Sequence, residues 1–107
     1  MRVKEDIKIE DMIYEIREIK IMLDSDLAKL YNVETKRINE VVKNNPKKFL
    51  ERFSWKLTSE ESNTFMVENF DHKSIETRGG RYKNPRVFTE HGIYMLSTVL
   101  KSNIELK

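Results

Sequence analysis

The sequence predicts a small single α+β domain with an N-terminal β-hairpin, a helix-turn-helix, and a basic glycine-tipped β-ribbon or loop before a C-terminal helix. Short β-rich runs of period two alternate along the chain with segments of helical period. Turn and capping residues separate these segments. The chain has 107 residues, 38% of them hydrophobic, which is enough to bury one core. We assign the domain to residues 13–102, between a charged segment at 1–12 and a tail at 103–107.

Two β-rich runs open the domain, at residues 13–16 and 19–23. In the second run aliphatic side chains occupy every other position, which is the pattern of a half-buried strand. The two runs predict a hairpin whose turn is Arg17-Glu18. This pair is an unusual choice, because neither residue readily adopts the positive φ of a two-residue turn.

A helix-turn-helix is predicted between residues 24 and 44. Asp24 and Ser25 offer side-chain oxygens for the N-cap of a first, two-turn helix. Such a helix pair needs a small residue where the helices cross, a turn residue that tolerates left-handed geometry, and an apolar anchor after it. These positions are held in order by Ala28, Asn32 and Val33. Any amphipathic helix pair shares part of this pattern, so the pattern alone does not indicate DNA binding. The residues on the outward face of the second helix are more informative.

The second predicted helix buries Ile38 and Val41 and ends before Pro46, which disfavours helical geometry in the residue that precedes it. In a major groove, Arg and Lys can pair with guanine and Asn with adenine. Arg37 and Asn39 are therefore the candidates for base contacts, whereas the lysines at the end of the helix would meet phosphates. The candidate DNA-binding residues of this segment are Thr35, Lys36, Arg37, Asn39, Lys43, Lys47 and Lys48.

The middle of the chain predicts a strand followed by a helix. From Phe53 to Leu57 apolar residues, Trp55 among them, alternate with polar ones, which predicts a strand with one apolar face. Thr58 and Glu61 have the spacing of a capping box, in which each side chain accepts a hydrogen bond from the other residue's backbone. The helix that follows is expected over 59–68, with Phe65 and Met66 as its buried residues.

The C-terminal helix is expected over residues 90–101, with Thr89 as its cap. Its apolar residues recur at helical spacing on one face and are Ile93, Leu96, Val99 and Leu100. His91 lies at the start of this helix without a recognisable nucleophile or metal partner, so packing or capping is its expected role.

A second basic element lies at residues 77–86, which hold four cations and no acid. A ribbon with Gly79-Gly80 at its tip could follow phosphates or place an arginine in a minor groove. Its candidate DNA-binding residues are Arg78, Gly79, Gly80, Arg81 and Lys83. A solvated loop is the alternative reading. A nucleotide-binding phosphate loop is disfavoured, because no Gly-Lys-Ser/Thr follows.

Charge is segregated along the chain, which favours a polyanionic partner. Residues 1–26 carry five bases and eight acids, whereas residues 27–107 carry fifteen bases and ten acids. Residues 35–48 alone hold five bases and one acid. Charge runs usually form a solvated face, so the placement of the cations is more informative than the net charge of +2.

Several classes of function are disfavoured. The chain has no cysteine, and His72 and His91 lack metal-ligand spacing, so we expect no metal and no cofactor. No catalytic constellation is recognisable, and we expect a protein that is not an enzyme. No apolar run approaches the length needed to span a bilayer. We expect no membrane association and a cytoplasmic location, in a bacterial cell or an infected host.

Three segments together resemble one family, the phage "ORF-six N-terminal" domain, a relative of the KilA-N and BRO-N domains. The first is residues 22–31 with 33–40, the second is residues 49–58, and the third is Arg78-Gly79-Gly80-Arg81 with residues 87–97. The similarity runs from about Ile13 to Ser102. Asn32 stands where the family commonly has glycine, and residues 61–73 match it only loosely.

The resemblance implies a double-stranded DNA-binding domain of phages, prophages and large DNA viruses, found in transcription regulators and antirepressors. Such regulators usually carry a second, C-terminal domain. The main hypothesis is therefore binding of duplex DNA, by a monomer or a homodimer. The rival hypothesis is a protein-interaction module that captures a repressor or a host protein, in which the basic surfaces meet an acidic partner.

Overall fold

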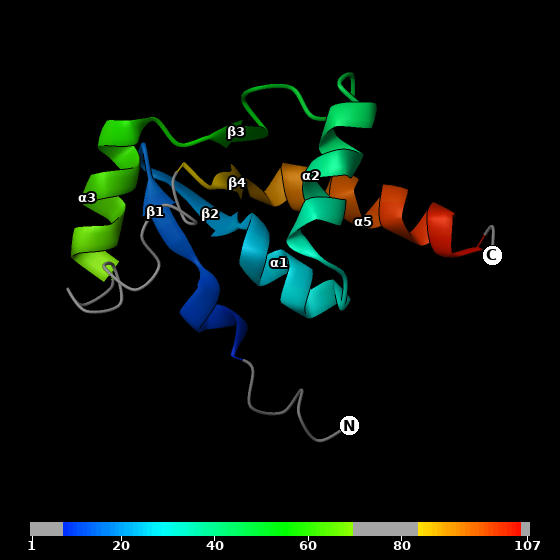
Figure 1. Cartoon of the computed structure of the whole chain (residues 1–107), viewed down its shortest axis with the longest axis horizontal. Coiled ribbons are helices and arrows are strands. Elements are labelled where there is room, and N and C mark those ends of the chain that lie inside the picture. Colours follow the sequence, from blue (N-terminus) through cyan, green and yellow to red (C-terminus); the bar gives the residue numbers. More distant parts are fainter. Residues whose placement is uncertain (1–7, 70–83, 106–107) are drawn as a thin grey trace.

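The computed structural model of the protein describes residues 8–69 and 84–105. Four antiparallel strands form one sheet in the order β1-β2-β4-β3. The strands are β1 (Tyr14–Ile16), β2 (Ile19–Leu23), β3 (Ser54–Lys56) and β4 (Arg86–Phe88). The helices are the 3₁₀ helix η2 (Ile9–Met12), α1 (Asp24–Tyr31), α2 (Thr35–Asn44), α3 (Ser59–Asn69) and α5 (Glu90–Glu105). The structure confirms the α+β class, with α3 on one side of the sheet and α1, α2 and α5 on the other (Figure 1).

The two faces of the sheet bury two separate apolar clusters. Alternation along β2 directs Met22 to the cluster that contains α1, α2 and α5, and its neighbours Ile21 and Leu23 to the cluster under α3. The same alternation in β4 separates Phe88 from Val87, and both are fully buried. The sheet is therefore a central layer, and α2 is held against one side of it.

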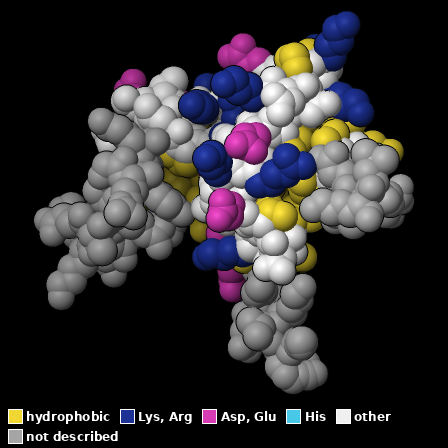
Figure 2. Space-filling view, turned by 45° about the vertical axis from the view of Figure 1, so that its right-hand side comes forward, with side chains coloured by type: hydrophobic (Ala, Val, Ile, Leu, Met, Phe, Trp, Pro, Cys, Tyr) yellow, Lys and Arg dark blue, Asp and Glu magenta, His cyan; other side chains and the backbone are white. Residues whose placement is uncertain are grey.

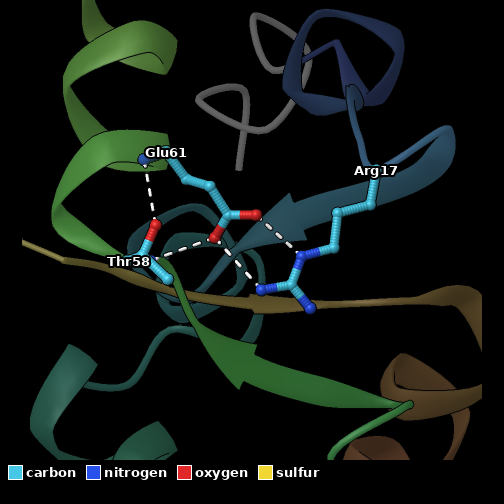
Figure 3. A network of polar contacts seen from close by, with 3 residues as sticks. All are labelled: Arg17, Thr58 and Glu61. Carbon is cyan, nitrogen blue, oxygen red and sulfur yellow. Dashed lines mark hydrogen bonds and ion pairs between the residues drawn. The ribbon is translucent and has the colours of Figure 1, made fainter.

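The predicted hairpin forms, and its unusual turn is stabilised from outside. Arg17 and Glu18 adopt φ values of 57° and 63°, the geometry of a two-residue turn of type I′. The guanidinium of Arg17 donates two hydrogen bonds to the carboxylate of Glu61, at 2.7 Å from Nε and 3.2 Å from Nη2 (Figure 3). It also lies 4.6 Å from the centre of the Trp55 ring. These contacts offset the backbone cost of a left-handed arginine.

The capping box at the start of α3 is confirmed. The N–H of Thr58 donates to Oε1 of Glu61 at 3.0 Å, and the N–H of Glu61 donates to Oγ1 of Thr58 at 3.1 Å. Figure 3 shows the Glu61 carboxylate between this cap and Arg17. Phe65 and Met66 are buried, as predicted. One carboxylate thus fixes the start of α3 and the tip of the hairpin together.

Two details of the predicted elements were wrong. α1 begins at Asp24 itself, and the N-cap position is Leu23, which makes no side-chain cap. Asp24 is 7% exposed and is used for contacts between elements instead. β3 begins at Ser54, one residue later than predicted, although Trp55 and Leu57 are buried and Lys56 is exposed as expected. Ser54 and Trp55 are both buried, whereas Phe53 is half-buried and its ring lies 4.1 Å from that of His91.

The C-terminal helix begins where the sequence predicted and extends further. Oγ1 of Thr89 accepts the N–H of Gly92 at 3.2 Å, which is the expected cap. Leu96 and Leu100 are buried, and Ile93 and Val99 pack against the same cluster. The helix continues to Glu105, beyond the predicted end at residue 101.

Candidate nucleic-acid interface

The turn between α1 and α2 has the backbone geometry that the sequence predicted. Asn32 adopts φ 59° and ψ 46°, the left-handed conformation that closes α1. The N–H of Val33 then donates to the carbonyl of Ala28 at 2.9 Å. α1 ends at Tyr31 and α2 begins at Thr35, so three residues connect the two helices. The short turn leaves the two helices packed directly on each other.

One face of α2 is fixed in the core. Ile38, Val41 and Val42 are buried, and they belong to the same apolar cluster as Leu27 and Ala28 of α1. Ile38 is 0% exposed. Because 3.6 residues complete one helical turn, these three positions define the inward side of α2 and determine which residues face outward.

The outward face of α2 is cationic at both ends. Lys36, Glu40 and Lys43 follow one another at i, i+4 and i+7 on the side opposite Ile38, and all three are exposed. Thr35, Arg37 and Asn39 flank this row and are partly buried. The carboxylate of Glu40, the one acid of residues 35–48, therefore lies between the two lysines.

Asn39 is already hydrogen-bonded within the protein. Its Nδ2 donates to Oδ2 of Asp24 at 3.0 Å and to the carbonyl oxygen of Thr35 at 3.1 Å. The Asp24 carboxylate also accepts the N–H of Ser25 at 2.7 Å and that of Arg86 at 3.4 Å. Asn39 thus links α2 to α1 and, through Asp24, to β4. An adenine contact by Asn39 stays a prediction, and it would have to share the amide that holds the helices.

The loop after α2 presents two more lysines from an ordered turn. The N–H groups of Lys48 and Phe49 both donate to the carbonyl of Asn45, at 3.0 Å and 3.3 Å. Nδ2 of Asn45 donates back to the carbonyl of Val41 at 2.8 Å. Phe49 is buried, so it anchors the turn, while Lys47 and Lys48 are exposed. The two lysines extend the cationic surface beyond the end of the helix.

The cations of α2 and of the loop after it form no ion pair with a carboxylate in the described part of the chain. Over residues 8–69 and 84–105, the ion pair found is Arg17–Glu61, and none involves α2 or its following loop. Figure 2 shows a band of Lys and Arg side chains across one face of the molecule, with fewer acidic side chains between them. We call the set Lys36, Arg37, Lys43, Lys47 and Lys48 the α2 cationic surface.

The second predicted basic element cannot be placed in the same way. Arg78, Gly79, Gly80, Arg81 and Lys83 lie outside the described residues. The strand expected after them is present as β4, but it lies between β2 and β3 in the sheet. Arg86 is therefore part of the central strand and is half-buried, rather than part of a projecting ribbon.

Two cations that the sequence did not single out lie beside the α2 cationic surface. Lys56 of β3 is the direct cross-strand partner of Arg86 of β4, and both line a groove that also includes Lys43 of α2. The alternation of residues 53–57 predicted which side chains of β3 share a face of the sheet. It did not predict that β4, about thirty residues later, would be the neighbouring strand.

The remaining candidates have structural roles. The His91 ring stacks on Phe53, in agreement with its expected packing role. No group of three or more His, Cys, Asp or Glu residues that could hold a metal ion occurs in the part of the chain that is described. Within the same residues, none of the helices has the length and apolar character needed to cross a bilayer.

By its fold the protein is a small α+β domain that carries a helix pair with a cationic outer surface. Residues 11–99 match the family model described as the ORF6N domain, so the chain belongs to the ORF6N domain family. This confirms the family resemblance of the three sequence segments, and it identifies a phage-type regulatory domain. No curated protein and no solved structure matches the chain.

Proposed function

We propose that the protein is a sequence-selective, double-stranded DNA-binding domain of a phage-type regulator and that α2 enters the major groove. The observation that carries the proposal is the α2 cationic surface. Lys36 and Lys43 lie opposite the buried face of α2, Arg37 flanks them, and Lys47 and Lys48 follow in the loop. None of the five cations has an ion-pair partner among the described residues. A B-DNA major groove admits one α-helix, and unpaired cations release condensed counterions when they reach phosphates.

Residues near the start of α2 are the candidates for reading bases. In helix-turn-helix proteins the N-terminal part of the second helix contacts base edges. Lys36 and Arg37 occupy this part. Arg37 is the candidate for pairing with guanine, whereas Lys36 is assigned to a phosphate. Glu40 is one turn further along the same face and can accept from the amino group of cytosine. A carboxylate between two lysines weakens binding to phosphate in general, and it favours a base contact over purely electrostatic binding.

Residues at the end of α2 are the candidates for phosphate contacts. Lys43, Lys47 and Lys48 are exposed, which suits contacts that position the protein without reading sequence. The proposal assigns no catalytic step and no cofactor to the domain. It places the protein in the cytoplasm, where its DNA target would be.

Selection from a random pool of duplex DNA tests the proposal. The expected result is an enriched motif, and half-site symmetry in that motif would indicate a homodimer. If Lys36, Lys43 and the predicted ribbon residues Arg78, Arg81 and Lys83 contact phosphates, log K should fall with log salt at a slope of about −4 to −5. Failure to enrich any sequence, together with an affinity independent of salt, would reject DNA binding and leave the protein-interaction module.

Arg37→Ala tests whether Arg37 contacts a base or a phosphate. The variant should lose about 1–3 kcal/mol on the selected motif and relax its preference at one position. Lys20→Ala is the matched control, because Lys20 is an exposed cation on β2, outside the α2 cationic surface. An equal loss on every sequence would instead assign Arg37 to a phosphate.

A further inference from the structure

A groove of about 440 Å³ lies between the end of α2 and the strands β3 and β4. Three cations from three different elements line it: Lys43 of α2, Lys56 of β3 and Arg86 of β4. Glu51 is the one carboxylate among its described lining residues. The groove is thus a basic concave surface at the end of the α2 cationic surface, and Lys43 belongs to both.

The strand register brings two of these cations directly opposite each other. Lys56 pairs with Arg86 across the antiparallel β3–β4 ladder, and both side chains lie on the face of the sheet that bears Ser54. Like charges in direct cross-strand pairs destabilise a sheet. Neither cation forms an ion pair among the described residues. An anion bound between them would relieve this repulsion.

Arg86 is held in place but only partly satisfied. Its backbone N–H donates to Oδ2 of Asp24 at 3.4 Å, and its Nη1 donates to Oγ of Ser54 at 3.1 Å. Burial lowers the pKa of this half-buried guanidinium, and the negative charge of Asp24 partly opposes that effect. A guanidinium carries five N–H donors. Among the described residues, Oγ of Ser54 is the acceptor found for this guanidinium, and it takes a hydrogen bond from Nη1. The remaining donors suit the planar, bidentate recognition of a phosphate.

The groove is confined to one face of the sheet. Trp55 is among its lining residues, but alternation along β3 directs the Trp55 side chain to the cluster under α3, on the face opposite Ser54 and Lys56. The Trp55 ring lies there 4.6 Å from the guanidinium of Arg17. The polar side chains that the two strands contribute to the groove are therefore those of Ser54, Lys56 and Arg86.

We propose that the groove formed by Lys43, Ser54, Lys56 and Arg86 binds a phosphate group of the nucleic-acid backbone. This inference rests on the proposed function and adds a contact from the sheet to the contacts from α2. A backbone phosphate is favoured over an acidic peptide because the groove continues the α2 cationic surface through Lys43. A duplex strand that leaves α2 would then pass directly over the groove.

Charge-removing substitutions on the two strands test the groove. Lys56→Gln removes an exposed cation and should leave the fold intact, whereas Arg86→Gln keeps a donor for Ser54. Each should weaken duplex binding roughly tenfold at about 50 mM salt and make the salt slope less steep by about 0.9. The selected base motif should stay the same, because phosphate contacts carry no sequence information. Lys20→Gln is the control and should change neither quantity.

The outcomes separate the groove from the proposed function. If Lys56→Gln and Arg86→Gln bind duplex DNA with the affinity and salt slope of the wild type, while Lys36→Ala binds it more weakly, the phosphate site in the groove is rejected and DNA binding by α2 is retained. A tenfold loss of duplex affinity in Lys56→Gln, with an unchanged melting temperature, supports the phosphate site in the groove even if Arg86→Gln is unstable. Arg86→Lys should recover part of the affinity, because it restores the charge without the bidentate donors.

Titration with inorganic phosphate distinguishes a free anion from a backbone phosphate. The expected result is duplex binding by the wild type that is weaker in Lys56→Gln. If the wild type binds no duplex, saturable binding of inorganic phosphate in calorimetry that is lost in Lys56→Gln supports a phosphate site and rejects its nucleic-acid source. No duplex binding together with no phosphate binding would overturn both proposals.

Discussion

Nδ2 of Asn39 donates a hydrogen bond to the buried Oδ2 of Asp24 at 3.0 Å, across the interface between α2 and α1. The same oxygen accepts the backbone N–H of Arg86 at 3.4 Å, so one carboxylate connects both helices to the central strand. Because Asn39 lies beside the outward row of α2, this bond couples the orientation of the candidate reading helix to the sheet that forms the groove.

Asn39→Ala should destabilise the fold by about 1.5–3 kcal/mol, because it removes a hydrogen bond to a largely buried carboxylate. Chemical denaturation measures this loss. A double-mutant cycle with Asp24→Ala should show that the two effects are not additive. Selection with Asn39→Ala then tests the predicted adenine contact, since a motif identical to that of the wild type would assign Asn39 to structure alone.

Asn32→Ala should destabilise the fold by about 1–2 kcal/mol, because the Cβ of alanine lies too close to the backbone carbonyl oxygen in the left-handed conformation that Asn32 adopts. Asn32→Gly is the matched variant and should be close to the wild type or slightly more stable, since glycine has no Cβ to clash. Urea unfolding of the three proteins provides the comparison. Equal stability of the alanine and glycine variants would contradict this role for the turn.

Gly92→Ala should destabilise the domain by about 1–3 kcal/mol through overpacking. A Cβ at Gly92 would clash with the backbone carbonyl oxygen of Phe53. That oxygen cannot move freely, because it accepts the N–H of Thr89 at 3.0 Å and its Oγ1 at 3.3 Å. The melting temperature should fall by several degrees, whereas Tyr94→Ala, at a site 63% exposed on the same helix, should change it little.

Stability should depend on pH through Glu61. The hydrogen bond from Arg17 holds the pKa of Glu61 below its ordinary range, and the hydrogen bond from the N–H of Thr58 lowers this pKa further. Because the folded-state pKa is lower than the unfolded one, the charged carboxylate stabilises the fold fully above about pH 4.3. This contribution is lost as the pH falls through the lowered folded-state pKa.

Glu61→Gln isolates the charge, because glutamine can keep the capping-box geometry without the ion pair. The variant should be less stable than the wild type at neutral pH, and the difference should shrink as the pH falls through the acid range. Thermal unfolding over a pH series measures it. Glu60→Gln, exposed in the same turn, is the control. A difference that stays constant with pH would show that the cap, rather than the ion pair, stabilises α3.

The sequence by itself determined the features that depend on near neighbours. Asn32 in the turn, the capping box of Thr58 and Glu61, the cap at Thr89, and the buried face of α2 were all predicted correctly. Each depends on residues no more than about four positions apart. Such contacts are set by backbone periodicity and by side-chain chemistry that can be read locally.

Only the tertiary structure decided which distant segments meet. Arg17 stabilises its own turn through Glu61, 44 residues away, and β4 enters the sheet between β2 and β3. That pairing places Arg86 opposite Lys56 and brings both beside Lys43. Composition and periodicity carry no information on strand order, because any half-buried strand fits several neighbours. The cations of α2 were therefore predictable from the sequence, whereas the groove beside them was not.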